Sequence, residues 1–421
     1  MMGHNKRRLI VLLLTLIFIF TFVSCGKDNK DFETDVDVKE ELTAKPTVEP
    51  TEEAEPVKED RNYMEIYNET GELLSLAELY KGKLRMGVAL SEHDIQGEKA
   101  ELVASQFNSL TCENEMKPDY ILDWNASVAQ GDEEVPAIKM DRAMQAIRFA
   151  EDNGLKIRYH TLVWHAQTPD WFFNVAYDNS EDAERVTRDV MIARLDNYIR
   201  LVMEYFNENH PGLIYAWDVV NEAISPGDGR EDGIRVADNN WFEVIGPDYI
   251  ELAFTFARKY AEPDQKLFYN DFQTYDKNKM YYLMNLIKGL QEKDIIDGIG
   301  MQDHMDMTNP GVLDYQYTLN RYASLGLEIQ VTELDINTDD NSEEGQRKLA
   351  ARYKGIMTII LDQIENDRAN ITSITFWGLT DDRSWLNNPD EPKYPLLFDE
   401  NLQAKPAFFG VAMDDSISIR N

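Results

Sequence analysis

The segment WDVVNEA, residues 217–223, ends an apolar, β-branched run on Asn221 and Glu222. A second segment, QVTELD at 330–335, ends a similar run on Glu333. Runs of this kind are typical of buried strands, and a carboxylate directly after one lies at the edge of its sheet. Because the two glutamates are far apart in sequence, only a closed fold could bring them together. The spacing of the other strands therefore decides the architecture.

Short apolar runs recur along the chain and alternate with longer segments of helical periodicity, which indicates βα units and a parallel sheet. We expect eight strands, at residues 84–90, 107–111, 156–161, 214–220, 266–270, 297–302, 327–333 and 373–379. The helices between them include one that ends near Gly154, the expected C-cap. Eight βα units that close on themselves form a (β/α)8 TIM barrel of the α/β class. We predict one such domain over residues 62–421.

The bulk composition narrows the class of partner. The 421 residues are 43% hydrophobic and carry a formal net charge of −35, so we expect a sizeable core and an acidic surface. Binding to nucleic acid needs clustered Lys and Arg, and so does docking onto anionic lipid headgroups. Neither partner is expected. A neutral polymer suits this charge, and the 7 Trp and 20 Tyr offer flat faces on which sugar rings can stack.

Residues 1–25 have the plan of a secretory signal. Three basic residues at 6–8 precede an apolar run over 9–20, which is shorter than the roughly 20 residues of a membrane-spanning helix. The sequence FVSC at 22–25 resembles the lipobox of bacterial lipoproteins, in which the cysteine is acylated. We therefore expect lipidation of Cys25 and an exported, membrane-anchored lipoprotein at the cell surface, whose only membrane contact is this lipid. Cleavage with secretion, or an uncleaved anchor, stays open.

The acidic segment 26–60 contains scarcely an aromatic residue. Such a composition cannot bury enough apolar surface to offset chain entropy, so we expect a disordered linker.

Only two cysteines occur, Cys25 and Cys112, and we expect no disulfide framework. Cys112 is expected to be a buried small hydrophobe rather than a nucleophile.

Polar and aromatic side chains gather at the C-terminal ends of the predicted strands. They are Glu113, Asn114, Lys117, His160, Trp164, His165, Asn221, Glu222, Asn270, Asp271, Gln302, His304, Glu333 and Trp377. In a (β/α)8 barrel these strand ends form the catalytic face, so the placement alone favours an enzyme. A pair of carboxyl groups across a cleft is what the cleavage of glycosidic bonds requires.

With these residues in view, the chain closely resembles the glycoside hydrolase family 10 endo-β-1,4-xylanases, from about Leu76 to Met413. The segments that carry the likeness are TCENEMKPD (111–119), HTLVWHAQTPDWF (160–172), WDVVNEAI (217–224), LFYNDF (267–272), GIGMQDHM (298–305), VTELDI (331–336), TFWGLTDDRSWL (375–386) and PLLFDENLQAKPAFFGV (395–411). Their joint order is highly specific.

The resemblance implies that Glu222 is the general acid/base and Glu333 the nucleophile of a retaining double displacement, which proceeds through a covalent glycosyl-enzyme intermediate. In such a mechanism the two carboxyl groups lie about 5–5.5 Å apart. We expect the nearby charge of Glu333 to raise the pKa of Glu222. The resemblance also implies that His304 orients Glu333, that Asp335 holds His304, and that Asn221 supports catalysis through a sugar hydroxyl.

The resemblance further implies a set of residues that bind xylan or xylo-oligosaccharides. These are Glu113, Asn114, Lys117, His160, Trp164, Gln167, Gln302, Trp377 and Trp385. His165 is interpreted as structural, and Asn270 and Asp271 could equally well bracket the barrel rim. We expect a monomer that needs no cofactor and no metal ion.

Two other functions stay open at this stage. One is a related β-1,4-glycanase or an exo-acting xylo-oligosaccharide hydrolase. The other is a glycan-capture protein on a degenerate barrel, which the intact glutamate pair argues against.

The chain also departs from the family pattern. Tyr159 stands where relatives usually have glycine, so we expect its ring near the barrel mouth, and Cys112 replaces a proline or similar residue. The segment 127–142 is longer and more acidic than usual.

Overall fold

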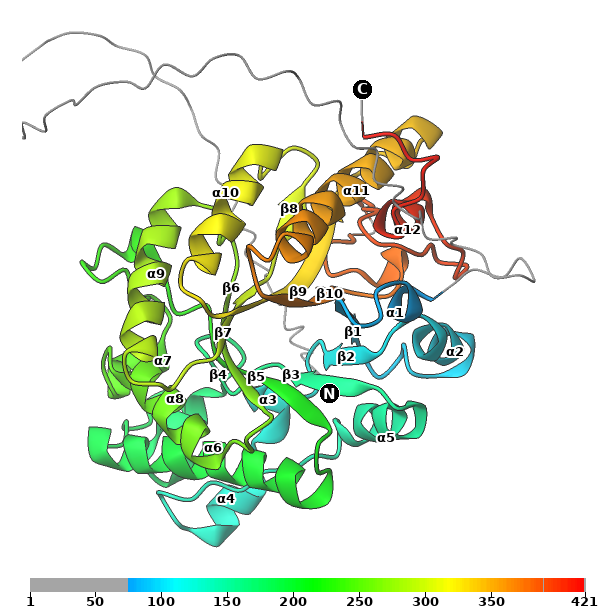
Figure 1. Ribbon diagram of the computed structural model, residues 1–421. Coiled ribbons are helices and arrows are strands. Elements are labelled where there is room, and N and C mark those ends of the chain that lie inside the picture. The colour runs from blue at the N-terminus through cyan, green and yellow to red at the C-terminus, as the bar shows by residue number, and fades with distance from the viewer. Residues whose placement is uncertain (1–74, 389, 420–421) are drawn as a thin grey trace, which may run out of the picture. The chain divides into compact units, whose positions relative to one another are not determined.

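The computed structural model describes residues 75–388 and 390–419 (Figure 1). The predicted signal segment, the lipidation site Cys25 and the linker 26–60 lie outside the described residues. So does the predicted start of the domain at residue 62. None of the helices within the described ranges is long and apolar enough to cross a membrane.

Eight parallel strands form the barrel. They are β1 (Arg85–Leu90), β2 (Ser109–Cys112), β3 (Lys156–Tyr159), β5 (Ile214–Asn221), β6 (Lys266–Asp271), β7 (Gly298–Met301), β9 (Glu328–Asn337) and β10 (Ile371–Phe376). Each pairs with the next in the order β10-β1-β2-β3-β5-β6-β7-β9, and β9 pairs with β10 to close the ring. The predicted (β/α)8 fold and all eight predicted strands are confirmed. Two short strands, β4 (Val163–Trp164) and β8 (His304–Asp306), pair in parallel with the C-terminal parts of β5 and β9.

Helices surround the ring of strands (Figure 1). They are α1 (Leu76–Leu79), α2 (Gly97–Gln106), α3 (Pro118–Ile121), α4 (Trp124–Gln130), α5 (Met144–Asn153), α6 (Arg188–Asn209), α7 (Asn240–Val244), α8 (Tyr249–Tyr260), α9 (Lys277–Gln291), α10 (Val312–Ala323), α11 (Glu343–Glu365) and α12 (Pro406–Val411). Short 3₁₀ turns are η1 (Asp170–Phe173), η2 (Val175–Tyr177), η3 (Pro226–Asp228) and η4 (Asp381–Arg383). The predicted cap is confirmed, since Gly154 ends α5 in the left-handed conformation with φ 69°.

The barrel interior carries polar side chains near the C-terminal ends of the strands. Arg158 on β3 forms an ion pair with Asp218 on β5, and both side chains are 1% exposed. On β7 the facing residue is Gly300, where a Cβ atom would overlap the side chain of Asn270. The missing side chain therefore leaves room for a buried amide. Since successive residues of a strand face opposite sides, His160 follows Arg158 on the interior face.

Tyr159 corrects one expectation. Its ring is fully buried and packs against Trp217 and against Phe206 of α6, with centroids 4.7 and 5.6 Å away. The residue lies between Arg158 and His160, which face the interior, so its own side chain points outward into the layer between strands and helices. The bulky ring therefore fills the helix interface and not the barrel mouth. Cys112 is buried at the end of β2, as predicted.

The acidic segment 127–142 is fastened to α6 and its neighbours through its backbone. Arg194 donates to the carbonyl of Glu133 at 2.7 Å, and Asn197 donates to the carbonyl of Glu134 at 3.1 Å. The side chain of Glu133 also accepts from the N–H of Ala176 at 3.0 Å, so both the backbone and a carboxylate of the segment hold it in place.

Candidate active site

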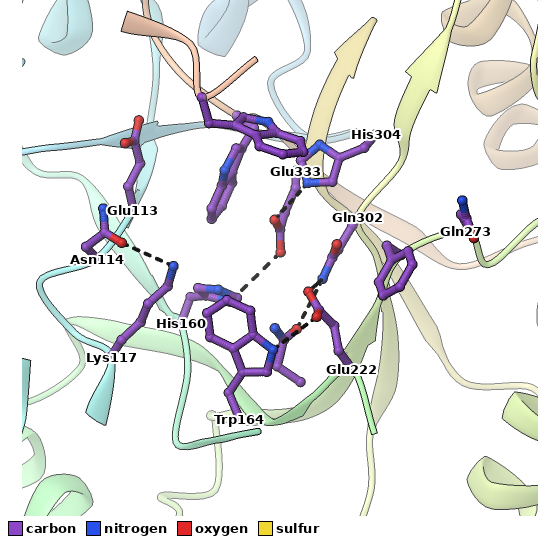
Figure 2. Close-up of a pocket in the computed structure, with 14 residues that line it drawn as sticks. Glu113, Asn114, Lys117, His160, Trp164, Glu222, Gln273, Gln302, His304 and Glu333 are labelled. Carbon is purple, nitrogen blue, oxygen red and sulfur yellow. Dashed lines mark hydrogen bonds and ion pairs between the residues drawn. The ribbon is translucent and has the colours of Figure 1, made fainter. Parts of the chain in front are cut away.

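A pocket of about 480 Å³ opens at the C-terminal ends of the strands (Figure 2). Its lining comes from seven of the eight barrel strands or the loops that follow them. The lining residues are Glu113, Asn114, Lys117, His160, Trp164, Asn221, Glu222, Phe272, Gln273, Gln302, His304, Glu333, Trp377 and Trp385. All predicted site residues of the described chain are in this set except Gln167 and Asp335, which lie directly behind it.

The backbone of Glu222 turns sharply at the end of β5. Its φ is +56°, in the left-handed region that a residue with a side chain rarely adopts. The turn is held because its N–H donates to the carbonyl of Asn270 at 2.9 Å and its own carbonyl accepts from Arg235 at 2.9 Å. The carboxylate thereby enters the pocket, where it accepts from Trp164 Nε1 at 3.0 Å and from Gln302 Nε2 at 2.9 Å.

The setting of Glu222 favours its protonated form. Burial raises the pKa of its carboxyl above the ordinary value, and the charge of Asp271 raises it further. The hydrogen bonds from Gln302 and Trp164 act in the opposite direction, and the charge of Glu333 adds a smaller upward contribution. The expected direction of the shift is therefore correct. The expected cause is wrong in part, because burial and Asp271 outweigh Glu333.

Glu333 lies within β9 and has the opposite setting. Its carboxylate accepts from Asn270 Nδ2 at 2.8 Å, and its second oxygen lies 3.1 Å from His304 Nε2. Burial alone would raise the pKa of this carboxyl. The hydrogen bond with His304, the positive charges of His160 and His304 and the bond from Asn270 outweigh burial and hold the pKa well below its ordinary range.

His304 connects Glu333 to a second buried carboxylate. Its Nδ1 atom lies 3.0 Å from Asp335 Oδ2, which also accepts from Trp385 Nε1 at 2.8 Å. Burial lowers the pKa of the imidazole, but the charges of Asp335 and Glu333 and the hydrogen bonds to them outweigh burial and raise the pKa overall. A protonated ring can donate to both carboxylates at once. This geometry is what the predicted supporting roles of His304 and Asp335 require, and the roles themselves stay predictions.

A bridge of side-chain amides joins the two glutamates. Gln302 Nε2, bonded to Glu222, also lies 3.2 Å from the amide oxygen of Asn221. Asn270 Nδ2, bonded to Glu333, lies 2.9 Å from the same oxygen. Movement of one carboxylate is thus resisted by groups that hold the other.

His160 lies beneath the pair. Its Nδ1 atom is 3.1 Å from Asp218 and 4.0 Å from Glu333. Its ring also meets Trp377 edge-on at a centroid distance of 5.4 Å. Trp377 is almost buried whereas Trp385 is 59% exposed, so Trp385 alone of these two forms an open rim of the pocket.

Charged groups mark one end of the pocket. Lys117 donates to Gln167 at 2.9 Å and to Asn114 at 3.4 Å, and its ammonium lies 4.8 Å from the Trp164 ring centroid. Gln167 in turn donates to Asn114 at 3.1 Å, so it positions two lining residues. Beside them, burial and the charge of neighbouring carboxylates raise the pKa of Glu113 to about 7.

Sequence reasoning missed the lining at the opposite end. Phe272 and Gln273 follow β6, and Gln273 lies across the pocket from Glu113 (Figure 2). The sequence offered one signal for these two residues, since they directly follow Asn270 and Asp271, the polar pair at the end of a predicted strand.

Asn270 is more than a rim residue, because it bonds to Glu333. Asp271 is fully buried and forms an ion pair with Lys279 at 2.6 Å. The structural interpretation of His165 fits its absence from the lining.

No group of three or more His, Cys, Asp or Glu side chains in the described part of the chain is arranged to hold a metal ion. Within the pocket, the surroundings of Glu222 favour the acid form of its carboxyl and those of Glu333 favour the anion.

Residues 75–414 match the model of a family described as glycosyl hydrolase family 10. The endo-1,4-beta-xylanase B of Butyrivibrio fibrisolvens is 41% identical over 353 residues, which cover 82% of this chain and 54% of that protein. The endo-1,4-beta-xylanase A of Thermotoga maritima is 39% identical over 346 residues, which cover 81% of this chain and 31% of that protein. The chain thus spans about half or less of these relatives.

Solved structures give the same picture. Modules of an endo-1,4-beta-D-xylanase of Clostridium thermocellum, solved with xylohexaose, superpose with a TM-score of 0.74 at 32% identity and cover 82% of this chain and 68% of that one. A mutant of an intracellular xylanase of Thermoanaerobacterium saccharolyticum, solved with xylotetraose, superposes with a TM-score of 0.70 at 35% identity, covering 81% and 98%.

Proposed function

Because the chain belongs to glycosyl hydrolase family 10, we propose that it is an endo-1,4-β-xylanase that hydrolyses xylan with retention of anomeric configuration. One observation carries the proposal: Glu222 and Glu333 line one pocket, and their surroundings push the pKa values of their carboxyls in opposite directions. Two titratable groups separated in this way are suited to act as acid and nucleophile.

The proposed reaction has two steps. A carboxylate oxygen of Glu333 attacks the anomeric carbon while Glu222 gives its proton to the glycosidic oxygen, so a glycosyl-enzyme ester forms and the aglycone leaves. Water then attacks the same carbon, Glu222 takes a proton from it, and the ester bond to Glu333 breaks. Two inversions at one carbon give net retention.

The substrate assignment rests on the lining and on the relatives. Trp164, Trp377 and Trp385 offer ring faces, and Asn114, Asn221 and Gln302 offer amides, a combination suited to neutral sugars. The relatives are described as endo-1,4-beta-xylanases, and two solved neighbours hold xylohexaose and xylotetraose. These names favour xylan over another β-1,4-glycan.

Hydrolysis of xylan, followed by reducing-sugar release and by NMR of the newly formed anomers, tests the proposal. We expect oligosaccharide products that appear first as the β-anomer. Glu222→Ala and Glu333→Ala should each lower the rate by roughly 10²–10⁴-fold or more. Initial α-anomer would contradict retention, and full activity in Glu333→Ala would exclude it as the nucleophile. Faster release from β-1,4-glucan would indicate a related glycanase, and release of terminal xylose alone an exo-acting enzyme.

We also propose that the chain is exported and anchored at the cell surface by acylation of Cys25. The support is the basic, apolar and FVSC pattern at residues 6–25. Incorporation of radiolabelled palmitate into the full chain, compared with Cys25→Ser, tests this. Equal labelling of both chains, or no labelling of either in a host that acylates other lipoproteins, would contradict it.

A further inference from the structure

An exposed apolar face lies outside the pocket on α9 and α10. We define the α9–α10 face as Lys277, Tyr281, Leu313 and Tyr317. Among the tyrosines of residues 75–388 and 390–419, only Tyr281 and Tyr317 are well exposed, at 63% and 47%. Leu313 is 78% exposed. Apolar side chains clustered in this way on a surface mark an interaction site more often than scattered ones do.

The four side chains lie on two neighbouring helices that Lys277 connects. Lys277 and Tyr281 are four residues apart on α9, and Leu313 and Tyr317 are four residues apart on α10, so each pair shares a helix face. Lys277 joins the two helices, because its ammonium lies 5.8 Å from the Tyr317 ring centroid and 3.3 Å from Asp314 Oδ1. The charge of Lys277 is therefore paired with Asp314, while Arg321, one helical turn after Tyr317, reaches Met284 of α9 at 3.5 Å.

The α9–α10 face continues from one end of the pocket. Gln273 lines the pocket at the end opposite Glu113 (Figure 2), and Lys277 follows it by one helical turn of chain at the start of α9. The helix α10 follows β8, whose first residue His304 also lines the pocket. Both helices therefore begin on the side of the barrel where the pocket opens, and Figure 1 shows them as neighbours.

We propose that the α9–α10 face binds a xylan chain that leaves the pocket past Phe272 and Gln273, with sugar rings stacked on Tyr281 and Tyr317. This inference rests on the proposed function and adds to it a binding surface outside the pocket for the aglycone part of a polymer. Flat aromatic faces with an internally neutralised ion pair suit an uncharged, linear polysaccharide.

A second copy of the chain is the competing occupant. A stable interface between proteins buries about 800 Å² on each partner, from roughly 20–30 residues. Four side chains with a paired charge between them fall far short of that size. A polymer held along its length needs only a few stacking contacts, because the pocket already holds it at one end.

The double variant Tyr281→Ala/Tyr317→Ala tests the proposal in the full chain. On soluble xylan we expect kcat/KM to fall about three- to tenfold through a higher KM, since two ring-stacking contacts are lost. On xylotriose we expect kcat/KM to stay unchanged, because a short oligomer held in the pocket leaves little chain to extend over α9. The double variant Tyr281→Phe/Tyr317→Phe keeps both rings and should behave as the wild type. Val128→Ala, an exposed apolar change on α4, is the matched surface control.

Binding without turnover separates this proposal from the proposed function. In a Glu333→Gln background, retention on insoluble xylan should weaken several-fold with the Ala pair and not with the Phe pair or Val128→Ala. Equal retention of all variants would overturn the α9–α10 site while leaving hydrolysis intact. A wild type that releases nothing from either substrate would overturn the proposed function instead. A change of sedimentation in the Ala pair without a change in retention would assign the face to self-association and also overturn the proposal.

Discussion

At the scale of single residues, the two glutamates differ because of their hydrogen-bond donors. Glu222 accepts from two neutral groups, Trp164 and Gln302, whereas Glu333 faces a protonated imidazole and a neutral amide. Donors that carry charge favour a carboxylate about twice as strongly as neutral ones. Because both carboxyls are buried, the cationic donor beside Glu333 and the charge of Asp271 beside Glu222 together decide which glutamate keeps its proton.

Trp164→Phe should move the basic limb of the pH profile upward. The indole N–H lowers the pKa of Glu222 by bonding to its anion. Without this bond the acid form persists to higher pH, so the decline of kcat/KM at alkaline pH should begin later, even though the absolute rate falls. Profiles of kcat/KM on xylotetraose for wild type and variant measure the shift. A basic limb that moves to lower pH would contradict this account.

His304→Asn should act on the other limb. It removes the cation and the hydrogen bond that lower the pKa of Glu333, so the carboxylate protonates at higher pH and the acidic limb moves upward. A lost bond to a charged group predicts a fall in kcat/KM of roughly 10- to 100-fold. The same xylotetraose profiles measure both effects. An unmoved acidic limb would leave His304 without the predicted role.

The sequence could indicate residues that follow a strand, because that position defines the barrel mouth whatever the packing. It could not indicate Asp218, which lies inside β5 and contacts His160 only because the closed barrel turns both inward. It also could not rank the causes that raise the pKa of Glu222, because the effect of the Asp271 charge depends on how close the folded barrel brings the two carboxyls.

At the scale of elements, the eight barrel strands were predictable because each is a short apolar run set between longer segments of helical periodicity. The strands β4 and β8 were not. Each has two or three residues and exists only through pairing with β5 or β9, so no local pattern specifies it. Yet β8 begins at His304 and aligns it with Asp335 across the ladder. The pairing of a strand too short to predict thus supplies a contact of the site.

The packing of α12 on α11 depends on one glycine. A Cβ at Gly410 would overlap the backbone carbonyl of Ala350 on α11, which cannot move without shifting the helix. Gly410→Ala should lower the free energy of unfolding by about 1–3 kcal/mol. Gly355→Ala, within α11 where a Cβ meets nothing within 4 Å, is the matched control and should stabilise by about 0.5–1 kcal/mol. Urea unfolding measures both, and equal effects would contradict the packing argument.

At the scale of the whole molecule, burial in the barrel raises the pKa of several carboxyls. Burial raises the pKa of Asp303 to about 7 and that of Asp381 to about 6. Burial is also the largest of the causes that raise the pKa of Glu113. An unfolded chain loses these protons near pH 4. Between about pH 4 and 7 these carboxyls therefore bind more protons in the folded chain than in the unfolded one, and their contribution to the free energy of unfolding falls as pH rises. His165, whose pKa burial lowers to about 4, contributes in the opposite direction.

Asp303→Asn should flatten this dependence. Asp303 is fully buried, has φ +55° and accepts from the Tyr315 hydroxyl at 2.6 Å. Asparagine tolerates that backbone and can still accept the bond, but it has no proton to lose. Relative to wild type, the variant should gain stability between pH 4.5 and 8, by at most about 4 kcal/mol. Urea unfolding at both pH values measures the gain, with the exposed Asp264→Asn as control. If Asp303→Asn keeps the slope of the wild type, another group governs the pH dependence, and the charge of Asp303 is already accommodated in the fold.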